Sequence, residues 1–287
     1  MQGFSNEDTI SLHITDICNV RCPGCYLGTS RSTEVMSRSI IDAAIQAIKP
    51  RNIVFFGGEA ILFPKLLLSV MRDYPDIHYV LHTNACIPIH DVLQRVDTIA
   101  ATVDAISPTY FYLKYGKRPI LYKNYADILI KYRDKIVITH NILPKNNDPN
   151  FFDWAKDYGR PVDCYVYVTA CKEQEYLASF DAVFPIPSIN VKPKIRVLRD
   201  GSVTRDMMAR RENILGSIYE WNPYWIHSEL SVCSKCEACP YMGRCHACNM
   251  FPHFCSSVLE SIDYEPHFCK FTKTFWERKE EQICSNV

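Results

Sequence analysis

Strand-like and helix-like segments alternate along the first 170 residues, and this alternation constrains the fold more than any other feature of the sequence. The strand-like runs are short and rich in valine, isoleucine, threonine and aromatic residues, and they cover residues 9–15, 52–56, 78–83, 98–103, 135–142 and 162–168. Apolar residues recur at helical spacing in the intervening segments, at residues 37–49, 64–74, 91–96, 124–134 and 151–159. Such alternation predicts βα units, in which parallel strands form one sheet and helices cover it.

The number of units predicts an open barrel. Six strand-like runs occupy residues 9–170, whereas a closed barrel of eight βα units needs roughly 250 residues. We therefore expect an α/β fold, a partial (β/α)6 TIM-like barrel. In such folds the functional groups gather at the carboxyl ends of the strands. Further along, residues 194–207 predict a hairpin that turns at Asp200-Gly201.

Composition excludes several classes of function. The chain has 287 residues and a formal net charge of zero, so no basic field indicates binding to nucleic acid. The first nine residues lack the basic start and apolar run of a signal peptide, and no apolar stretch approaches the roughly 18 residues of a membrane span. These features predict a soluble, cytoplasmic protein without a membrane partner.

Fourteen cysteines are many for a cytoplasmic chain. In a reducing compartment, clustered cysteines indicate metal binding or chemistry rather than disulfides. Three lie within "CNVRCPGC" and seven lie between residues 233 and 269. The other four are scattered, and we interpret them as small buried hydrophobic residues: Cys86, Cys164, Cys171 and Cys284.

The first cluster holds only three thiols, Cys18, Cys22 and Cys25. A structural zinc site usually takes four protein ligands, so this set of three thiols lacks one ligand. Three thiolates can instead hold three irons of a [4Fe–4S] cluster and leave the fourth iron open. An open iron can bind a substrate or cofactor, which is a catalytic arrangement.

"CNVRCPGC" resembles the C-x3-C-x2-C motif of the radical S-adenosylmethionine (SAM) superfamily, in which it follows the first strand of a partial barrel. The resemblance implies a [4Fe–4S] cluster on Cys18, Cys22 and Cys25. It also implies that SAM chelates the open iron and is cleaved to methionine and a 5′-deoxyadenosyl radical, which abstracts a hydrogen from substrate. One departure is Gly24, where many members have a bulky residue before the third cysteine.

Other strand ends extend the resemblance. "FFGGEA" is similar to the "GGE" segment of the superfamily, which implies contacts with the SAM amine, and "TVDAIS" is similar to a segment near the ribose hydroxyls. "HTNA" resembles a third segment that lies near SAM. The residues that this resemblance places in the SAM site are Gly57, Gly58, Glu59, Asn84, Asp104, Asn141 and Tyr26.

The second cysteine cluster resembles the SPASM/twitch-like extension of radical SAM enzymes. "CEACPYMGRCHAC", from Cys236 to Cys248, nearly matches the core spacing of that extension. The resemblance implies a radical SAM barrel over residues 1–180 and a small cysteine-rich auxiliary-cluster domain over residues 181–287.

The sequence allows more than one set of cysteine ligands in the auxiliary domain. Relatives have two further cysteines that this chain lacks, so we expect at least one auxiliary [4Fe–4S] cluster, held by Cys236, Cys239, Cys245 and Cys269. Cys255 is an alternative to Cys269, and a second cluster would draw on Cys233, Cys248 and Cys255. The paired Cys-x2-Cys spacings of the tail also fit zinc knuckles.

The resemblance implies an oxidoreductase that modifies a peptide, as in ribosomal peptide maturation by crosslinking, oxidation, epimerisation or excision. It also implies a reducing electron donor such as flavodoxin or ferredoxin. Only about nine residues precede the barrel, so either a separate protein binds the leader of the precursor peptide or the substrate is a small molecule such as a sugar or nucleoside. A non-catalytic zinc or Fe–S binding module is the third alternative. Thiol redox sensing explains the number of cysteines but not their spacing.

Overall fold

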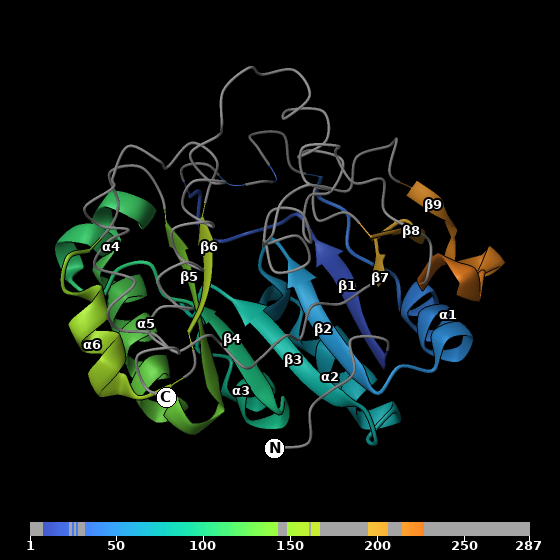
Figure 1. Cartoon of the computed structure of the whole chain (residues 1–287), viewed down its shortest axis with the longest axis horizontal. Coiled ribbons are helices and arrows are strands. Elements are labelled where there is room, and N and C mark those ends of the chain that lie inside the picture. Colours follow the sequence, from blue (N-terminus) through green and yellow to red (C-terminus); the bar gives the residue numbers. More distant parts are fainter. Residues whose placement is uncertain are drawn as a thin grey trace, which may run out of the picture.

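The computed structural model describes residues 8–22, 25, 27, 32–142, 148–160, 162–166, 195–205 and 214–226. Its first six strands lie side by side in chain order, and each pair of neighbours is parallel (Figure 1). They are β1 (Thr9–Thr15), β2 (Asn52–Gly57), β3 (His78–Thr83), β4 (Thr98–Thr102), β5 (Ile136–Ile142) and β6 (Val162–Val166). The predicted partial (β/α)6 barrel is confirmed.

Among the described residues, six α-helices connect these strands and lie along the outside of the curved sheet (Figure 1). They are α1 (Arg38–Ile48), α2 (Pro64–Asp73), α3 (His90–Arg95), α4 (Pro108–Tyr115), α5 (Pro119–Lys131) and α6 (Phe151–Tyr158). Ser37 caps α1 by accepting a hydrogen bond from the backbone N–H of Ile40, and Gly159 ends α6 in the left-handed conformation. Both helix boundaries follow from the local sequence.

Helix α4 is not among the helices expected from the sequence, and α5 begins five residues before the predicted start at residue 124. Both helices start with a proline, Pro108 and Pro119. Proline fits the first position of a helix because its φ is already helical and its missing N–H has no partner there. The two prolines were therefore signals for helix starts.

The sheet separates two apolar clusters. Residues of one face pack against the helices and form the main core, as Leu12, Phe55 and Leu81 do with essentially no exposed surface. The opposite, inner face holds a smaller cluster of Val54, Phe56, Val80 and Ala100. Because successive side chains of a strand point to opposite faces, both clusters come from the same strands.

The C-terminal hairpin extends the same sheet. Strands β7 (Ile195–Val197) and β8 (Ser202–Thr204) are antiparallel and turn at Asp200-Gly201, as predicted, and β9 (Ile214–Ser217) follows at the edge. Strand β7 also pairs in parallel with β1, which was not expected, so in the described part of the chain one sheet of nine strands has the order β6-β5-β4-β3-β2-β1-β7-β8-β9. Residues 167–194 lie outside the described residues, and the domain boundary at residue 180 stays a prediction.

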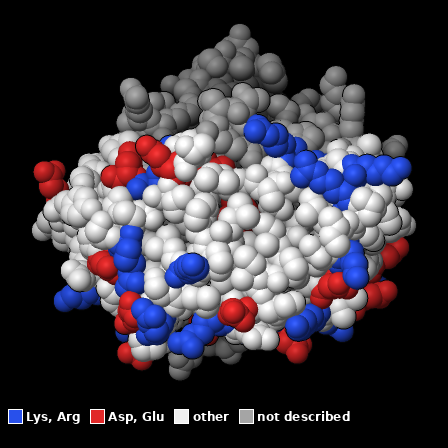
Figure 2. Space-filling model, turned by 180° about the vertical axis from the view of Figure 1, so that it is seen from behind, with Lys and Arg blue, Asp and Glu red and all other residues white. Residues whose placement is uncertain are grey.

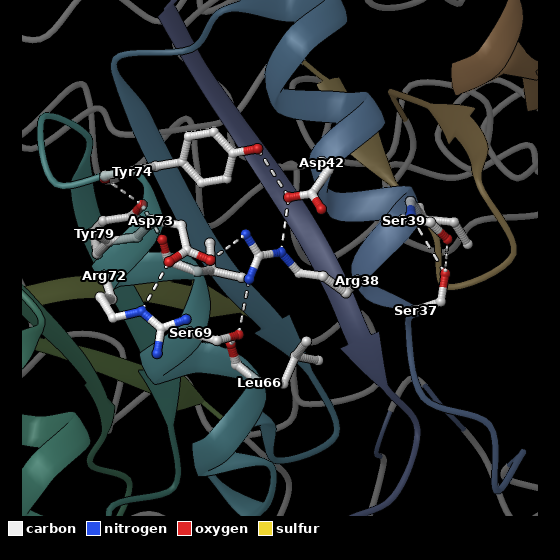
Figure 3. Close-up of polar contacts among 12 residues, drawn as sticks. Ser37, Arg38, Ser39, Asp42, Leu66, Ser69, Arg72, Asp73, Tyr74 and Tyr79 are labelled. Carbon is white, nitrogen blue, oxygen red and sulfur yellow. Dashed lines mark hydrogen bonds and ion pairs between the residues drawn. The ribbon is translucent and has the colours of Figure 1, made fainter.

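A polar network joins α1 to α2 at the surface (Figure 3). The guanidinium of Arg38 donates from Nε to Asp42 Oδ1 at 2.8 Å and from Nη1 to Ser69 Oγ at 3.0 Å, and its Nη2 lies 3.0 Å from Asp73 Oδ2. Tyr74 donates from its hydroxyl to the same Asp42 oxygen. One arginine therefore connects two helices that pack on neighbouring strands.

Acidic and basic side chains are interspersed over much of the face in Figure 2, with an extended uncharged area between them. This mixture agrees with the zero formal net charge. Among the described residues, no helix has both the length and the apolar character that crossing a membrane requires.

Candidate functional site

The three N-terminal cysteines lie on one loop after the carboxyl end of β1. We call residues 16–34 the cysteine loop. Cys18, Cys22 and Cys25 are half-buried in it, and the backbone N–H of Cys25 donates to the carbonyl oxygen of Cys22 at 3.3 Å. The loop thus presents three thiols at the end of the sheet where Glu59, Asn84 and Asp104 follow β2, β3 and β4.

The end of β2 holds the start of the cysteine loop by backbone contacts. The N–H of Gly58 donates to the carbonyl of Thr15 at 2.7 Å, and the N–H of Glu59 donates to the carbonyl of Ile17 at 2.9 Å. A Cβ on Gly58 would lie 2.4 Å from the Ile17 oxygen, and a Cβ on Gly57, whose φ is +130°, would lie 2.4 Å from the Thr15 oxygen. Only glycine permits this approach of the two backbones.

Asn84 connects Glu59 to the first cysteine. Its backbone N–H donates to Glu59 Oε2 at 2.8 Å, while its side-chain Nδ2 donates to Asn19 Oδ1 at 2.8 Å and lies 3.7 Å from Cys18 Sγ. Asn84 Oδ1 in turn accepts the backbone N–H of Cys86 at 3.0 Å. The structure therefore brings together three residues that the sequence placed at the ends of separate strands.

Glu59 is fully buried, and its environment changes its acidity. Burial raises the pKa of the Glu59 carboxyl to about 7, although the N–H of Asn84 opposes this shift. The Oε1 atom of Glu59 and the nearby Nδ2 of Asn19 are both buried without a hydrogen-bond partner. Glu59 Oε1 can accept hydrogen bonds from a bound group, and Asn19 Nδ2 can donate hydrogen bonds to one.

Asp104 and Asn141 form a second polar group at the ends of β4 and β5. Asn141 donates to Asp104 Oδ1 through its backbone N–H at 2.6 Å and through its side chain at 3.1 Å. Lys114 makes a buried ion pair with Asp104. Burial lowers the pKa of the Lys114 ammonium to about 8, while the electrostatic influence of Cys22 acts in the opposite direction.

His140 lies behind this group and is neutral. Its Nδ1 is 2.8 Å from the carbonyl oxygen of Val103, and its ring stacks on Phe151 with a centroid separation of 3.7 Å. Burial lowers the pKa of His140 to about 3. The neutral ring therefore donates its Nδ1 proton to the carbonyl oxygen, and it supports β5 rather than supplying charge.

The segment after β4 packs over the cysteine loop, and sequence reasoning missed it. Arg118 donates to the carbonyl oxygen of Asn19 at 3.0 Å, and Tyr115 is buried with no partner for its hydroxyl. Together with Lys114, these residues come from the end of α4 and the turn that follows it. The prolines that begin α4 and α5 were signals for the helices, but nothing local indicated that this turn reaches the loop.

The donor set suits an iron–sulfur cluster. Thiolates are its usual ligands, and each thiolate of a cluster binds a different iron, so the thiols need not converge on one point. Within the described part of the chain, no three His, Cys, Asp or Glu side chains are arranged to hold a single metal ion. The unpartnered Glu59 and Asn19 atoms next to the loop fit a polar ligand beside the cluster.

Several predicted site residues lie outside the described residues. They are Tyr26, Cys233, Cys236, Cys239, Cys245, Cys248, Cys255 and Cys269. Of the scattered cysteines, Cys86 has no exposed surface, which confirms its interpretation as a small buried residue.

The sequence and the fold are both similar to those of known proteins. A family model described as the Radical SAM superfamily matches residues 12–158. The fold is similar to native anSMEcpe with bound AdoMet and Cp18Cys peptide, with a TM-score of 0.67 at 15% identity over 96% of this chain and 98% of that chain. It is also similar to Streptococcus suis SuiB bound to precursor peptide SuiA, with a TM-score of 0.57 at 10% identity over 83% of this chain and 70% of that chain. At these identities the structural likeness shows the fold alone, and no curated protein matches the sequence.

Proposed function

The chain belongs to the radical SAM superfamily, and on that premise we propose that it reductively cleaves SAM and abstracts a hydrogen atom from a peptide substrate. The family implies an enzyme that uses a [4Fe–4S] cluster and SAM. When bound, these two cofactors supply a 5′-deoxyadenosyl radical. The protein contributes binding, orientation and exclusion of water.

The observation that supports this proposal most is the contact between three strand ends. Cys18 follows β1, Glu59 follows β2 and Asn84 follows β3, and hydrogen bonds place the three side by side. In the proposed site, Cys18, Cys22 and Cys25 bind the cluster. Asn84 holds the first ligand in place, and the loop cannot shift without breaking the backbone bonds to Gly58 and Glu59.

Glu59 is proposed to bind the amino group of SAM. Its carboxyl has a pKa of about 7 because it is buried, and an ammonium group beside it would lower that pKa. The unpartnered Oε1 can accept the hydrogen bond of the ammonium group. Gly57 and Gly58 are proposed to lie at the same amine, because without side chains they let the start of the cysteine loop pack directly against the end of β2.

Asp104 and Asn141 are proposed to bind the ribose hydroxyls of SAM. In the structure the carboxylate of Asp104 is already engaged by Lys114 and Asn141. Each carboxylate oxygen has two lone pairs and can accept a further hydrogen bond. Tyr26 is a further proposed contact of SAM.

A peptide is the proposed substrate because two proteins with this fold carry one. The structure of anSMEcpe contains a Cp18Cys peptide, and that of SuiB contains its precursor peptide SuiA. The proposal includes at least one auxiliary [4Fe–4S] cluster on the C-terminal cysteines, and a reducing donor such as flavodoxin or ferredoxin. It also includes a separate protein that binds the leader of the precursor peptide, and a cytoplasmic location.

The first experiment tests the cofactors. Protein purified without oxygen is expected to be brown and, with SAM and reductant, to release 5′-deoxyadenosine. The variant Cys18→Ala/Cys22→Ala/Cys25→Ala should lose four irons per chain and all of this activity. Colourless protein loaded with zinc would refute the proposal and favour a structural metal module.

The second experiment tests the substrate. The region beside the gene is searched for short open reading frames, and each encoded peptide is incubated with the active enzyme and followed by mass spectrometry. A mass change in a peptide that depends on SAM would support peptide modification. If sugars or nucleosides accelerate the formation of 5′-deoxyadenosine and peptides do not, the substrate is a small molecule while the SAM chemistry stands.

A further inference from the structure

The two ends of the cysteine loop lie side by side, and we call residues 14–16 and 32–36 the neck of the loop. The N–H of Met36 donates to the carbonyl of Ile14 at 2.7 Å, and Thr15 forms an isolated antiparallel bridge with Val35. The hydroxyl of Thr15 also donates to the carbonyl of Glu34 at 3.1 Å. The chain therefore leaves and re-enters the sheet at almost the same place, and all three thiols lie on the segment in between.

Asp16 is a buried charged residue of this neck. Its Oδ1 lies 2.7 Å from Nε2 of His13, and its Oδ2 accepts the N–H of Ser32 at 3.3 Å. The first contact is to β1 and the second is to the returning end of the loop. Asp16 stands two residues before Cys18, so its position limits where the first thiol can lie.

Arg199 reaches this neck from the C-terminal hairpin. Its Nη1 lies 2.7 Å from Asp16 Oδ2, and its Nε lies 3.2 Å from Glu34 Oε2. One guanidinium thus holds both ends of the cysteine loop. A planar fork with several fixed N–H groups can bind two carboxylates at once, which the ammonium of lysine does less well.

The place of Arg199 is set by the sheet and by a tight turn. Strand β7 pairs in parallel with β1 and ends at Val197, opposite Leu12, so the residues that follow β7 run beside the carboxyl-terminal part of β1. The N–H of Gly201 donates to the carbonyl of Leu198 at 2.9 Å, and Gly201 has a φ of +87°, which favours glycine. Arg199 is the second residue of this four-residue turn, which fixes the position of its backbone.

We propose that Arg199 is a positioning residue that closes the neck of the cysteine loop and thereby makes retention of the N-terminal cluster depend on the C-terminal hairpin. The inference rests on the proposed function, because it takes the three thiols as cluster ligands. Without the guanidinium, Asp16 and Glu34 are two carboxylates with no shared cation, and the two ends of the loop separate more readily. The thiols then release iron faster.

The test measures iron release from the full-length holoprotein. Wild type and Arg199→Gln are loaded with iron and sulfide without oxygen and mixed with an iron chelator. The N-terminal cluster is followed by the part of its electron paramagnetic resonance signal that changes on addition of SAM. We expect Arg199→Gln to lose this signal about fivefold faster, and Arg199→Lys to lie between the variant and wild type.

Two further variants control the test. Arg51→Gln removes an exposed arginine that pairs with Asp8 before the start of β1, and it should release iron at the wild-type rate. Glu34→Gln removes one partner of Arg199 whose side chain is 73% exposed, so it tests the neck without endangering the fold. We expect its release to be about twofold faster than that of wild type.

The outcomes separate the two proposals. Wild-type release rates in Arg199→Gln and Glu34→Gln would overturn the role of Arg199 while leaving the cluster in place. Equally fast release in Arg51→Gln would also overturn it, because the effect would not be specific to the neck. If the triple cysteine variant keeps the SAM-dependent signal, the proposed function itself is wrong.

Discussion

Glu59 shows how burial sets the chemistry of one residue. Its carboxyl has a pKa of about 7 in the folded protein and an ordinary value of 4.5. Between these values the folded state binds more protons than the unfolded state, so the stability that the protonated carboxyl contributes is lost as the pH rises. This contribution is fully present below about pH 4.5 and gone above about pH 7.

Glu59→Gln removes this titration. We expect the free energy of unfolding of the variant, relative to wild type, to rise by about 2 kcal/mol between about pH 5.5 and about pH 8. Denaturant titrations of both proteins at several pH values measure this difference. A difference that stays constant over the range would show that the Glu59 carboxyl is not buried as described.

The same variant should bind SAM more weakly, because it lacks the negative charge.

The buried pair of Lys114 and Asp104 gives a second prediction at the scale of residues. Lys114→Met leaves the Asp104 carboxylate buried without its cation, which should lower the free energy of unfolding by about 3–5 kcal/mol. In Asp104→Asn/Lys114→Met no unpaired charge remains, and the amide oxygen can still accept the N–H of Asn141. Denaturant unfolding should therefore show partial recovery in the double variant, and additive losses would argue against the pair.

At the scale of elements, Arg38 links two neighbouring helices. Arg38 of α1 contacts Ser69 and Asp73 of α2, and it also binds Asp42 within its own helix (Figure 3). We expect Arg38→Met to lower the free energy of unfolding by about 1–2 kcal/mol, because three contacts are lost and solvent screens each of them in part.

Arg72→Met provides the matched control. Arg72 is more exposed, with 73% of its side chain accessible, and its ion pair is with the neighbouring Asp73 on the same helix. We expect the free energy of unfolding of this variant to equal that of wild type within error, since such exposed pairs contribute little. Equal losses in both variants, measured by thermal or denaturant unfolding, would contradict a special role for Arg38.

At the scale of the whole molecule, strand order predicts the pattern of local opening. Strand β1 is paired on both sides, with β2 and with β7, whereas β9 is paired only with β8 among the described residues. Residues that are paired on both sides and buried open only in large unfolding events. In hydrogen exchange followed by mass spectrometry, peptides from β1 and β2 should therefore exchange more slowly than those from β9. Fast exchange in β1 would indicate that the hairpin does not cover it.

Much of the fold could be predicted because its signals are local. Alternating apolar runs marked all six barrel strands, the serine before α1 marked its start, and Asp200-Gly201 marked the hairpin turn. In the structure the predicted residue Asn84 contacts both Glu59 and Cys18, because parallel strands bring their carboxyl ends to one edge.

The sequence by itself determined the βα alternation, the cysteine loop and the strand-end motifs, since each depends on spacing within a few residues. Only the tertiary structure decided what surrounds the loop. The turn after α4 brings Arg118 to Asn19, and Arg199 reaches Glu34 across 165 residues of chain. No local pattern encodes such contacts, because they follow from the pairing of β7 with β1 and from the packing of a helix that starts at a proline.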